Sequence, residues 1–204
     1  PDFAAALRQI QEVNKSNKEE EDEDCLLMVG HLHVKMHNME LALQALRRVT
    51  ELNPNRAEAW LMQAVLEQSK YRQTTASAEE AIRCYDKALL ALKFNKQHIP
   101  FELHNNVGAL RFRVGDYAHA LEALNAGLEQ LTSSSLEETV TLVYNQSRVL
   151  EALGRFDEAE ENYRQLALRC NHMDAQMRLA QIQFDRGDFK SAVQEVISPP
   201  THPD

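Results

Sequence analysis

The sequence has few of the residues that mark disulfide frameworks, aromatic cores or turn-rich β folds. Its 204 residues include 6 glycines, 6 prolines and 3 cysteines, and aromatic residues make up only 6%. Cys25, Cys84 and Cys170 lie far apart and form no CxxC pair, so neither a zinc site nor a disulfide framework is predicted. Each cysteine is interpreted as a small buried apolar residue. The sparse glycine and proline suit an all-helical chain.

Long apolar runs and excess positive charge are also missing. No run of about 18 apolar residues occurs, so no membrane-spanning segment is predicted. Lysine and arginine number 22 against 31 aspartates and glutamates, a formal charge of −9. Direct nucleic-acid binding would need a basic stripe, so the charge favours protein partners. The chain opens on Pro1 and shows no signal-peptide pattern, and we expect it to be a segment of a longer protein.

Motifs of catalytic chemistry are absent as well. The sequence contains no glycine-rich phosphate loop, no HExxH and no nucleophile elbow. His33 and His37 stand four residues apart and could share a metal, but no third ligand follows at a suitable spacing. The sequence therefore predicts no enzyme activity, no cofactor and no metal.

What the chain does contain is a repeated helical hairpin. The stretch Asn105–Leu124 predicts a helix, a turn at Gly115-Asp116 and a second helix, and an alanine follows the turn glycine by five residues. The same turn recurs at Gly154 and Gly187, and more degenerate copies lie upstream. The repeat alanines are Ala42, Ala81, Ala120, Ala159 and Ala192, at intervals of 39, 39, 39 and 33 residues. One hairpin cannot bury its own apolar faces, so stacked copies are expected.

This pattern resembles the tetratricopeptide repeat (TPR), whose period is about 34 residues. The fold class predicted is all-α, a right-handed superhelical array of TPR helix-turn-helix repeats, or α-solenoid. Small residues in the first helix of each hairpin are expected to let the second helix approach. The positions assigned to repeat packing are Gly30, Ala42, Trp60, Ala64, Ala81, Gly108, Ala120, Gly154, Ala159, Gly187 and Ala192, with Ser147 and Ala180 as further small first-helix positions.

The predicted repeats have the following bounds. Residues 1–17 are expected to be the second helix of a truncated upstream repeat. Repeats follow at 24–54, 57–94, 101–131, 136–169 and 173–198, the last one truncated. The second repeat carries an insertion at its turn, where Gln73–Ser77 looks loop-like. The acidic run 18–24 and the serine run Thr132–Ser135 fit linkers, although a docking patch and a phosphorylation site stay open as alternatives.

The first helices of such an array line its concave face, and a partner-binding groove is predicted there. Amide side chains can bond the main chain of a peptide, and arginines can pair with its carboxylates. The alternative is that Asn105 and Asn106 brace neighbouring helices. The predicted groove set is His31, Asn105, Asn106, Ala109, Arg113, Tyr144, Asn145, Arg148, Met177, Arg178 and Gln181, with Leu27, Leu61 and Val65 beside it.

One stretch carries a more specific resemblance. Glu102–Asp116 (ELHNNVGALRFRVGD) is similar to a hairpin of the large TPR subunit of the RNA polymerase II-associated factor (Paf) elongation complex. Residues 57–68, 143–163 and 185–189 resemble its neighbouring segments in the same order. The resemblance implies a nuclear scaffold that binds the Paf subunit, organises the other subunits on elongating polymerase II and is linked to histone modification. A cytoplasmic or ciliary peptide adaptor, or the TPR arm of an enzyme such as a protein glycosyltransferase, are the alternatives.

Overall fold

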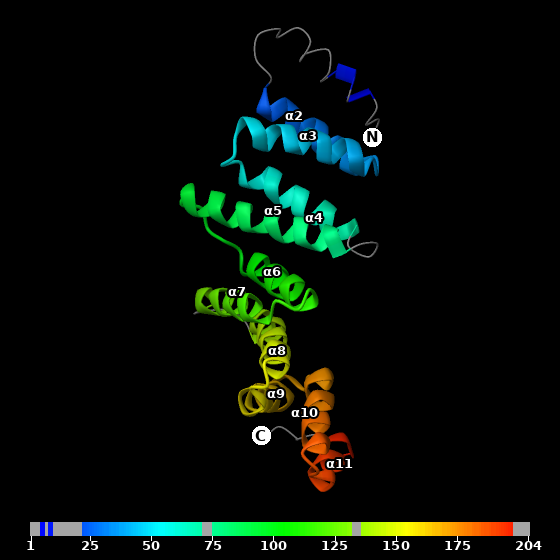
Figure 1. The fold of residues 1–204 in the computed structure, drawn as a ribbon, viewed down its shortest axis with the longest axis vertical. Coiled ribbons are helices and arrows are strands. Elements are labelled where there is room, and N and C mark those ends of the chain that lie inside the picture. Colours follow the sequence, from blue (N-terminus) through cyan, green and yellow to red (C-terminus); the bar gives the residue numbers. More distant parts are fainter. Residues whose placement is uncertain (1–4, 7, 10–21, 71–74, 132–135, 198–204) are drawn as a thin grey trace. The chain divides into compact units, whose positions relative to one another are not determined.

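The computed structural model describes residues 5–6, 8–9, 22–70, 75–131 and 136–197, and these separate into two compact units, 1–99 and 100–204 (Figure 1). All the labelled elements are α-helices. Those of the first unit are α2 (Glu23–Lys35), α3 (Met39–Leu52), α4 (Ala57–Lys70) and α5 (Thr75–Phe94). Those of the second unit are α6 (Phe101–Arg113), α7 (Tyr117–Gln130), α8 (Leu136–Ala152), α9 (Phe156–Cys170), α10 (Met173–Asp185) and α11 (Phe189–Ile197).

Successive helices pair into hairpins. In the first unit α2 packs on α3 and α4 on α5, and α3 and α4 join the two hairpins. In the second unit the hairpins are α6–α7, α8–α9 and α10–α11, and α7–α8 and α9–α10 contacts join them. The first helices α6 and α8 also touch. Nearest-neighbour packing of this kind is typical of helical repeats.

Close approach of the two helices of a hairpin depends on the small first-helix position. A Cβ atom added to Gly108 would lie 2.5 Å from Cγ of Leu124, and one added to Gly30 would lie 3.0 Å from Cγ of Leu46. Gly30, Ala64, Gly108, Ser147 and Ala180 are all buried, and so are the five repeat alanines. Because the glycines leave no side chain in the contact, a leucine of the second helix can lie directly against the first helix.

Each unit has its own apolar core. In the first unit Leu27, Leu43, Leu46 and Val49 pack with Ala59 and Leu66 of α4. In the second unit one cluster joins Leu124 to Leu142 and Val149, and another joins Tyr163 to Leu179 and Ile182. The side chain of Tyr163 is completely buried. Burial of these side chains between hairpins stabilises helices that would be marginal alone.

The turns end the first helices in a common way. At Gly115 the backbone has φ 85°, its N–H bonds to the carbonyl of Phe112, and the next N–H bonds back to Arg111. Gly154 and Gly187 repeat this geometry with φ 75° and 83°. A side chain at any of these three glycines would meet nothing within 4 Å. The assignment of Gly154 and Gly187 to repeat packing is therefore wrong: they are required by the left-handed backbone of the turn.

One of the described helices includes residues that the sequence placed in a loop. Thr75–Ser77, expected in a loop, lie in the first turn of α5. Asp22 caps α2 by accepting a hydrogen bond from the N–H of Asp24, so the end of the acidic run belongs to a helix start. The remainder of that run, the serine run Thr132–Ser135 and most of the helix expected over residues 1–17 lie outside the described residues.

Candidate interaction surface

The predicted groove begins with an amide pair between two first helices. The side-chain N–H of Asn145 on α8 donates to Oδ1 of Asn105 on α6 over 2.7 Å, and both residues are half-buried. The amides therefore hold two hairpins together, which matches the bracing alternative for Asn105. Asn106, one residue on, is exposed and remains available to a partner.

Arg148 of α8 also contacts the preceding hairpin. Its guanidinium carbon lies 5.0 Å from the ring centroid of Phe112 on α6. Phe112 in turn packs against Tyr117 across the α6–α7 turn, with ring centroids 5.5 Å apart. Arg148 is half-buried where it stacks on this ring. Its guanidinium, predicted from the sequence to face a partner in the groove, therefore contacts an aromatic ring of the protein itself.

Arg178 is paired within the protein. Its Nε donates to Oε2 of Glu151 over 3.1 Å, and its second guanidinium nitrogen bonds the other carboxylate oxygen. The hydroxyl of Tyr163 donates to the same carboxylate over 3.1 Å. Burial and the adjacent Glu151 charge raise the pKa of Tyr163 above its ordinary value, so the phenol stays protonated as the donor. Arg178 thus joins α10 to α8 and is not a free anchor for a partner carboxylate, contrary to the sequence interpretation.

Tyr144 is likewise committed to packing. Its ring lies 5.9 Å from that of Tyr163 and 4.9 Å from that of His172, measured between centroids. His172 caps α10, because its Nδ1 accepts the backbone N–H of Ala175 over 3.1 Å. The side chain of Tyr144 is half-buried where α8, α9 and the start of α10 meet.

Other members of the predicted set keep exposed side chains. Arg113 at the end of α6 is exposed, as are Met177 and Gln181 on α10. The side-chain amide of Gln181 donates to Oδ1 of Asp185 in the same helix over 2.8 Å. Ala109 is half-buried. The polar first-helix face therefore separates into bracing residues and residues that stay open to solvent.

In the first unit the predicted groove residues differ in exposure and in their contacts. His31 contacts Glu58 across α2 and α4, with 3.1 Å between Nε2 and Oε1. Leu27 is buried in the core, so its assignment to the groove is wrong, whereas Val65 is 57% exposed. Trp60 is half-buried and donates its indole N–H to the carbonyl of Pro54 over 2.8 Å. Among the described residues no three His, Cys, Asp or Glu side chains gather as metal ligands.

Two residues that the sequence reading missed are central to these contacts. Phe112 stands four residues after Gly108, and Glu151 stands four residues after Ser147. Each contacts an arginine of the next first helix. The repeat register was the signal that could have found them. A polar groove of about 520 Å³ also lies between α7, α8 and α9, where Gln146 bonds both Asn125 and Asn162.

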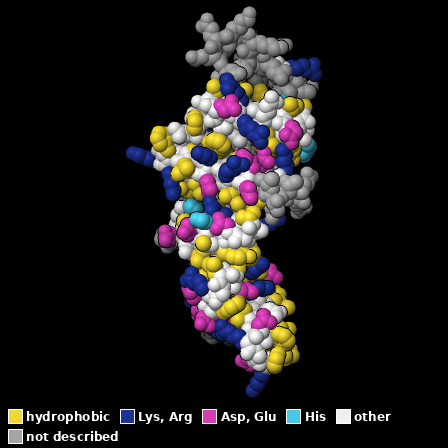
Figure 2. All heavy atoms as spheres, viewed as in Figure 1, with side chains coloured by type: hydrophobic (Ala, Val, Ile, Leu, Met, Phe, Trp, Pro, Cys, Tyr) yellow, Lys and Arg dark blue, Asp and Glu magenta, His cyan; other side chains and the backbone are white. Residues whose placement is uncertain are grey.

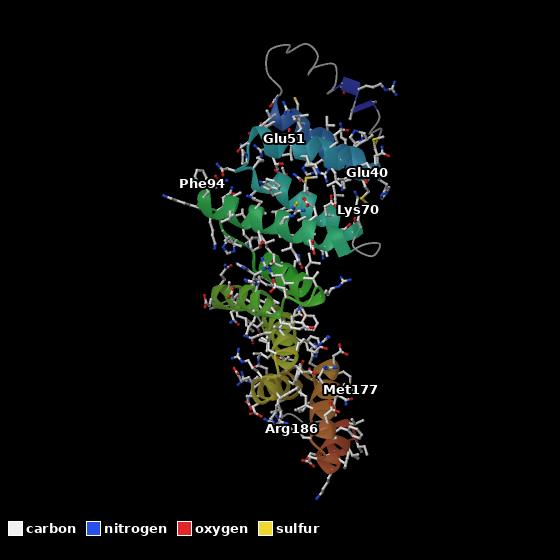
Figure 3. All side chains as sticks on the ribbon, in the orientation of Figure 1. Glu40, Glu51, Lys70, Phe94, Met177 and Arg186 are labelled. Atoms are coloured by element: carbon white, nitrogen blue, oxygen red, sulfur yellow. The ribbon has the colours of Figure 1, made fainter. Side chains whose placement is uncertain are left out.

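An apolar surface covers the last hairpin of the described chain. It surrounds a groove of about 390 Å³ between α10 and α11. The view in Figure 2 shows hydrophobic side chains gathered over this end of the molecule, and Met177 is labelled in Figure 3. We call it the α10–α11 surface, and its main residues are Met177, Phe184, Ala192, Val193, Val196 and Ile197.

The tetratricopeptide-repeat family model matches residues 27–70 and 144–198. A curated relative, Protein CTR9 homolog of Arabidopsis thaliana, is 27% identical over 194 residues, which covers 77% of this chain but only 17% of that protein. No helix among the described residues is long and apolar enough to cross a bilayer.

Solved structures agree on the fold. YrrB, described as a TPR protein with an unusual peptide-binding site, is 19% identical with a TM-score of 0.71 over 92% of this chain and 88% of its own. MamA of Desulfovibrio magneticus RS-1 is 15% identical with a TM-score of 0.66 over 85% and 90%. The hairpins, their packing and these similarities confirm the predicted fold class, and the chain is an all-α tetratricopeptide-repeat array, an α-solenoid.

Proposed function

We propose that this chain is part of a non-catalytic scaffold subunit of the Paf elongation complex, located in the nucleus. The observation that carries the proposal is the similarity to the plant CTR9 homologue, which extends along 77% of the chain. The resemblance of Glu102–Asp116 to the Paf-complex TPR subunit points the same way. The TPR fold itself supports only the broader role of binding other proteins.

The exposed first-helix residues of the second unit are the proposed contacts for the Paf subunit. Asn106 and Gln181 carry amides that can bond a main chain, and Met177 offers an adaptable apolar contact. Asn105, Asn145 and Arg178 contribute by fixing the helices that present these side chains. The bound segment would then be read mainly by amides and apolar contacts, with little help from free arginines.

A peptide adaptor outside transcription is the second candidate. The same exposed amides favour it, since recognition of a main chain does not depend on which complex supplies the peptide. The fold shared with YrrB and MamA is compatible with this role.

Affinity capture of the full-length protein from nuclear extract, read by mass spectrometry, separates these candidates. Recovery of Paf-complex subunits with RNA polymerase II is the expected result. The variant Asn106→Asp with Met177→Ala should lose the Paf subunit, whereas Glu122→Ala, exposed on the second helix α7, should keep it. Recovery of other cargo without any Paf-complex subunit would reject the transcription assignment and favour the adaptor.

A further inference from the structure

A groove on the second unit is crossed by a chain of side-chain amides. It lies between α7, α8 and α9, has a volume of about 520 Å³, and we call it the α7–α9 groove. Asn162 of α9 donates its side-chain N–H to Oε1 of Gln146 on α8 over 3.1 Å, and Gln146 donates to Oδ1 of Asn125 on α7 over 2.7 Å. By the nearest-neighbour packing of the hairpins, a further repeat after α11 would pack on α11, which does not line this groove.

The chain of amides leaves hydrogen-bonding groups for a bound main chain. Each amide has two N–H donors and an oxygen that can accept two bonds. In the part of the chain that the structure describes, the amide of Asn125 only accepts and that of Asn162 only donates. The two N–H groups of Asn125 can thus bond a main-chain carbonyl, and Oδ1 of Asn162 can accept a main-chain N–H. An extended segment presents both of these groups along its length.

The α9 side of the groove carries more negative than positive charge. Three carboxylates line it, those of Asp157, Glu158 and Glu161, together with the guanidinium of Arg155. Arg155 pairs with Glu158 through bonds of 2.6 and 2.7 Å. Glu161 accepts a bond from Arg164 over 3.0 Å, but its side chain is 57% exposed, so it can receive a further cation.

The α7 side of the groove is acidic as well. Glu122 and Glu129 are exposed and stand three residues before and four residues after Asn125, so they flank it on the helix surface. The sequence of α7 contains no lysine or arginine. Two acidic sides favour a ligand whose positive side chains point in both directions.

Comparison of the repeats shows that this junction lacks a cation that the other junctions within the units carry. The residue five positions after the repeat alanine is Arg47 in α3 and Arg164 in α9, but Asn125 in α7. Arg47 bonds Glu67 of the next helix over 3.1 Å, and Arg164 bonds carboxylates of its own helix. A positive group on a ligand would bring to Asn125 the charge that the chain itself supplies at the other two junctions.

We propose that the α7–α9 groove binds an extended segment of a partner protein that contains adjacent lysine or arginine residues. The main chain of the segment bonds the amides of Asn125 and Asn162. Its successive side chains point in opposite directions, so adjacent cations reach the carboxylates of α7 and those of α9. The contacts proposed for the Paf subunit lie on α6 and α10, which do not line this groove, so binding here does not depend on the Paf-complex assignment.

These 204 residues are a poor source for that segment, in the same copy or in a second one. The sequence contains one adjacent pair of basic residues, Arg47-Arg48, and that pair lies inside the helix α3. Residues 198–204 contain no lysine or arginine, and the run 18–24 is mainly acidic. The ligand is therefore expected to be a different polypeptide.

A short basic peptide tests the chemistry of the groove. The peptide SRRSRRS, fluorescently labelled and with blocked termini, would be titrated with the full-length protein, and binding followed by anisotropy. We expect saturable binding of this peptide and none of SEESEES. A version of SRRSRRS that is methylated on its main-chain nitrogens should bind about tenfold more weakly, because it cannot donate to the amides. Equal binding of the methylated peptide would show attraction by charge alone and overturn the proposal.

Variants of the protein locate the bound peptide. Asn125→Arg supplies the missing cation from the chain itself and should weaken binding about tenfold. Glu161→Gln should weaken it about two- to fivefold, as expected for an exposed ion pair. The matched control is Glu51→Gln in the first unit, labelled in Figure 3, because Glu51 is also exposed and also pairs with an arginine three residues away. This control should bind like the parent, and circular dichroism checks that all variants keep their helices.

Three outcomes would overturn the proposal. The first is absence of saturable binding to the full-length protein. The second is equal loss of binding in Glu161→Gln and Glu51→Gln, which would mean general attraction to an acidic surface. The third is binding by residues 1–204 but not by the full-length protein, which would assign the groove to another part of the same chain.

Discussion

At the end of α2 a histidine adopts the backbone conformation that glycine adopts at other turns. His37 has φ 59°, its N–H bonds to the carbonyl of Val34, and the N–H of Asn38 bonds to that of His33. This is the bonding found at Gly115, so His37 takes part in ending the helix. From the sequence His37 was considered only as a possible metal ligand. Residue spacing does not show that its backbone is left-handed, so its role in ending the helix was not predicted.

Replacing His37 by glycine should therefore stabilise the protein. A side chain in the left-handed region costs about 1–2 kcal/mol, and His37→Gly should recover about 1 kcal/mol after the entropy of the more flexible unfolded chain is counted. Urea unfolding would show a higher midpoint. The reciprocal change Gly115→His should lower the midpoint, and a His37→Gly protein less stable than the parent would mean that the imidazole makes a compensating contact.

Between elements, polar and aromatic side chains link one first helix of the second unit to the next, beside the apolar packing of α7 on α8 and of α9 on α10. Asn145 bonds Asn105, Arg148 covers Phe112, and Arg178 bonds Glu151. Each of these pairs joins consecutive hairpins of the second unit. The residues chosen from the sequence as partner contacts were in large part the residues that hold neighbouring helices, since both roles call for polar side chains on the same helix face.

A double-mutant cycle on Arg148 and Phe112 would measure one such contact. The single variants Arg148→Met and Phe112→Leu and their combination should show a coupling energy of about 0.5–1 kcal/mol in unfolding, as expected for a partly exposed cation–π pair. Arg186, which bonds Asp157 and Glu160 and is labelled in Figure 3, provides the control pairing with Phe112. A coupling near zero for Arg148 would return it to the set of residues available for a partner.

The α6–α7 turn should respond to acid. Partial burial acts to raise the pKa of Asp116, but hydrogen bonds from the side chain and backbone of His119, with the charge of Arg111, outweigh it and lower the pKa below 3.8. Because the pKa of Asp116 is lower in the folded protein, its ionised carboxylate stabilises the fold above pH 3.8. This stabilisation is lost as the pH falls through the folded-state pKa. Asp116→Asn should thus be less stable than the parent at neutral pH, with the difference shrinking below pH 3.8 in urea unfolding. A difference independent of pH would assign the effect to hydrogen-bond geometry alone.

At the scale of the molecule, each of the three apolar clusters described above lies within one unit. The cluster around Leu46 belongs to residues 1–99, and those around Leu124 and Tyr163 belong to residues 100–204. Because helical repeats draw their stability from local neighbours, each unit expressed alone should show a helical circular dichroism spectrum and a cooperative melt. A unit that stays unfolded alone would show that it depends on the other for its core.

The fold could be predicted from the sequence because small residues at fixed intervals leave few ways to pack. The positions of Gly108 and Ala120 hold small residues in the other repeats as well. Small side chains at both positions let the two helices of a hairpin pack closely. Partner binding by the predicted groove stays a prediction. Asn106 and Gln181 are exposed, whereas Leu27 is buried and Arg178 is paired. Which of two neighbouring polar residues turns toward the next helix depends on the packing angle, which spacing does not encode.

The sequence by itself determined the helical hairpins, their order and the small contacts inside them, because these depend on residues close together in the chain. The tertiary structure alone decided which side chains remain for partners. Arg178 is paired with Glu151 of another hairpin, and Arg148 lies over the ring of Phe112. The exposure of each arginine therefore depends on a residue that is distant in the sequence.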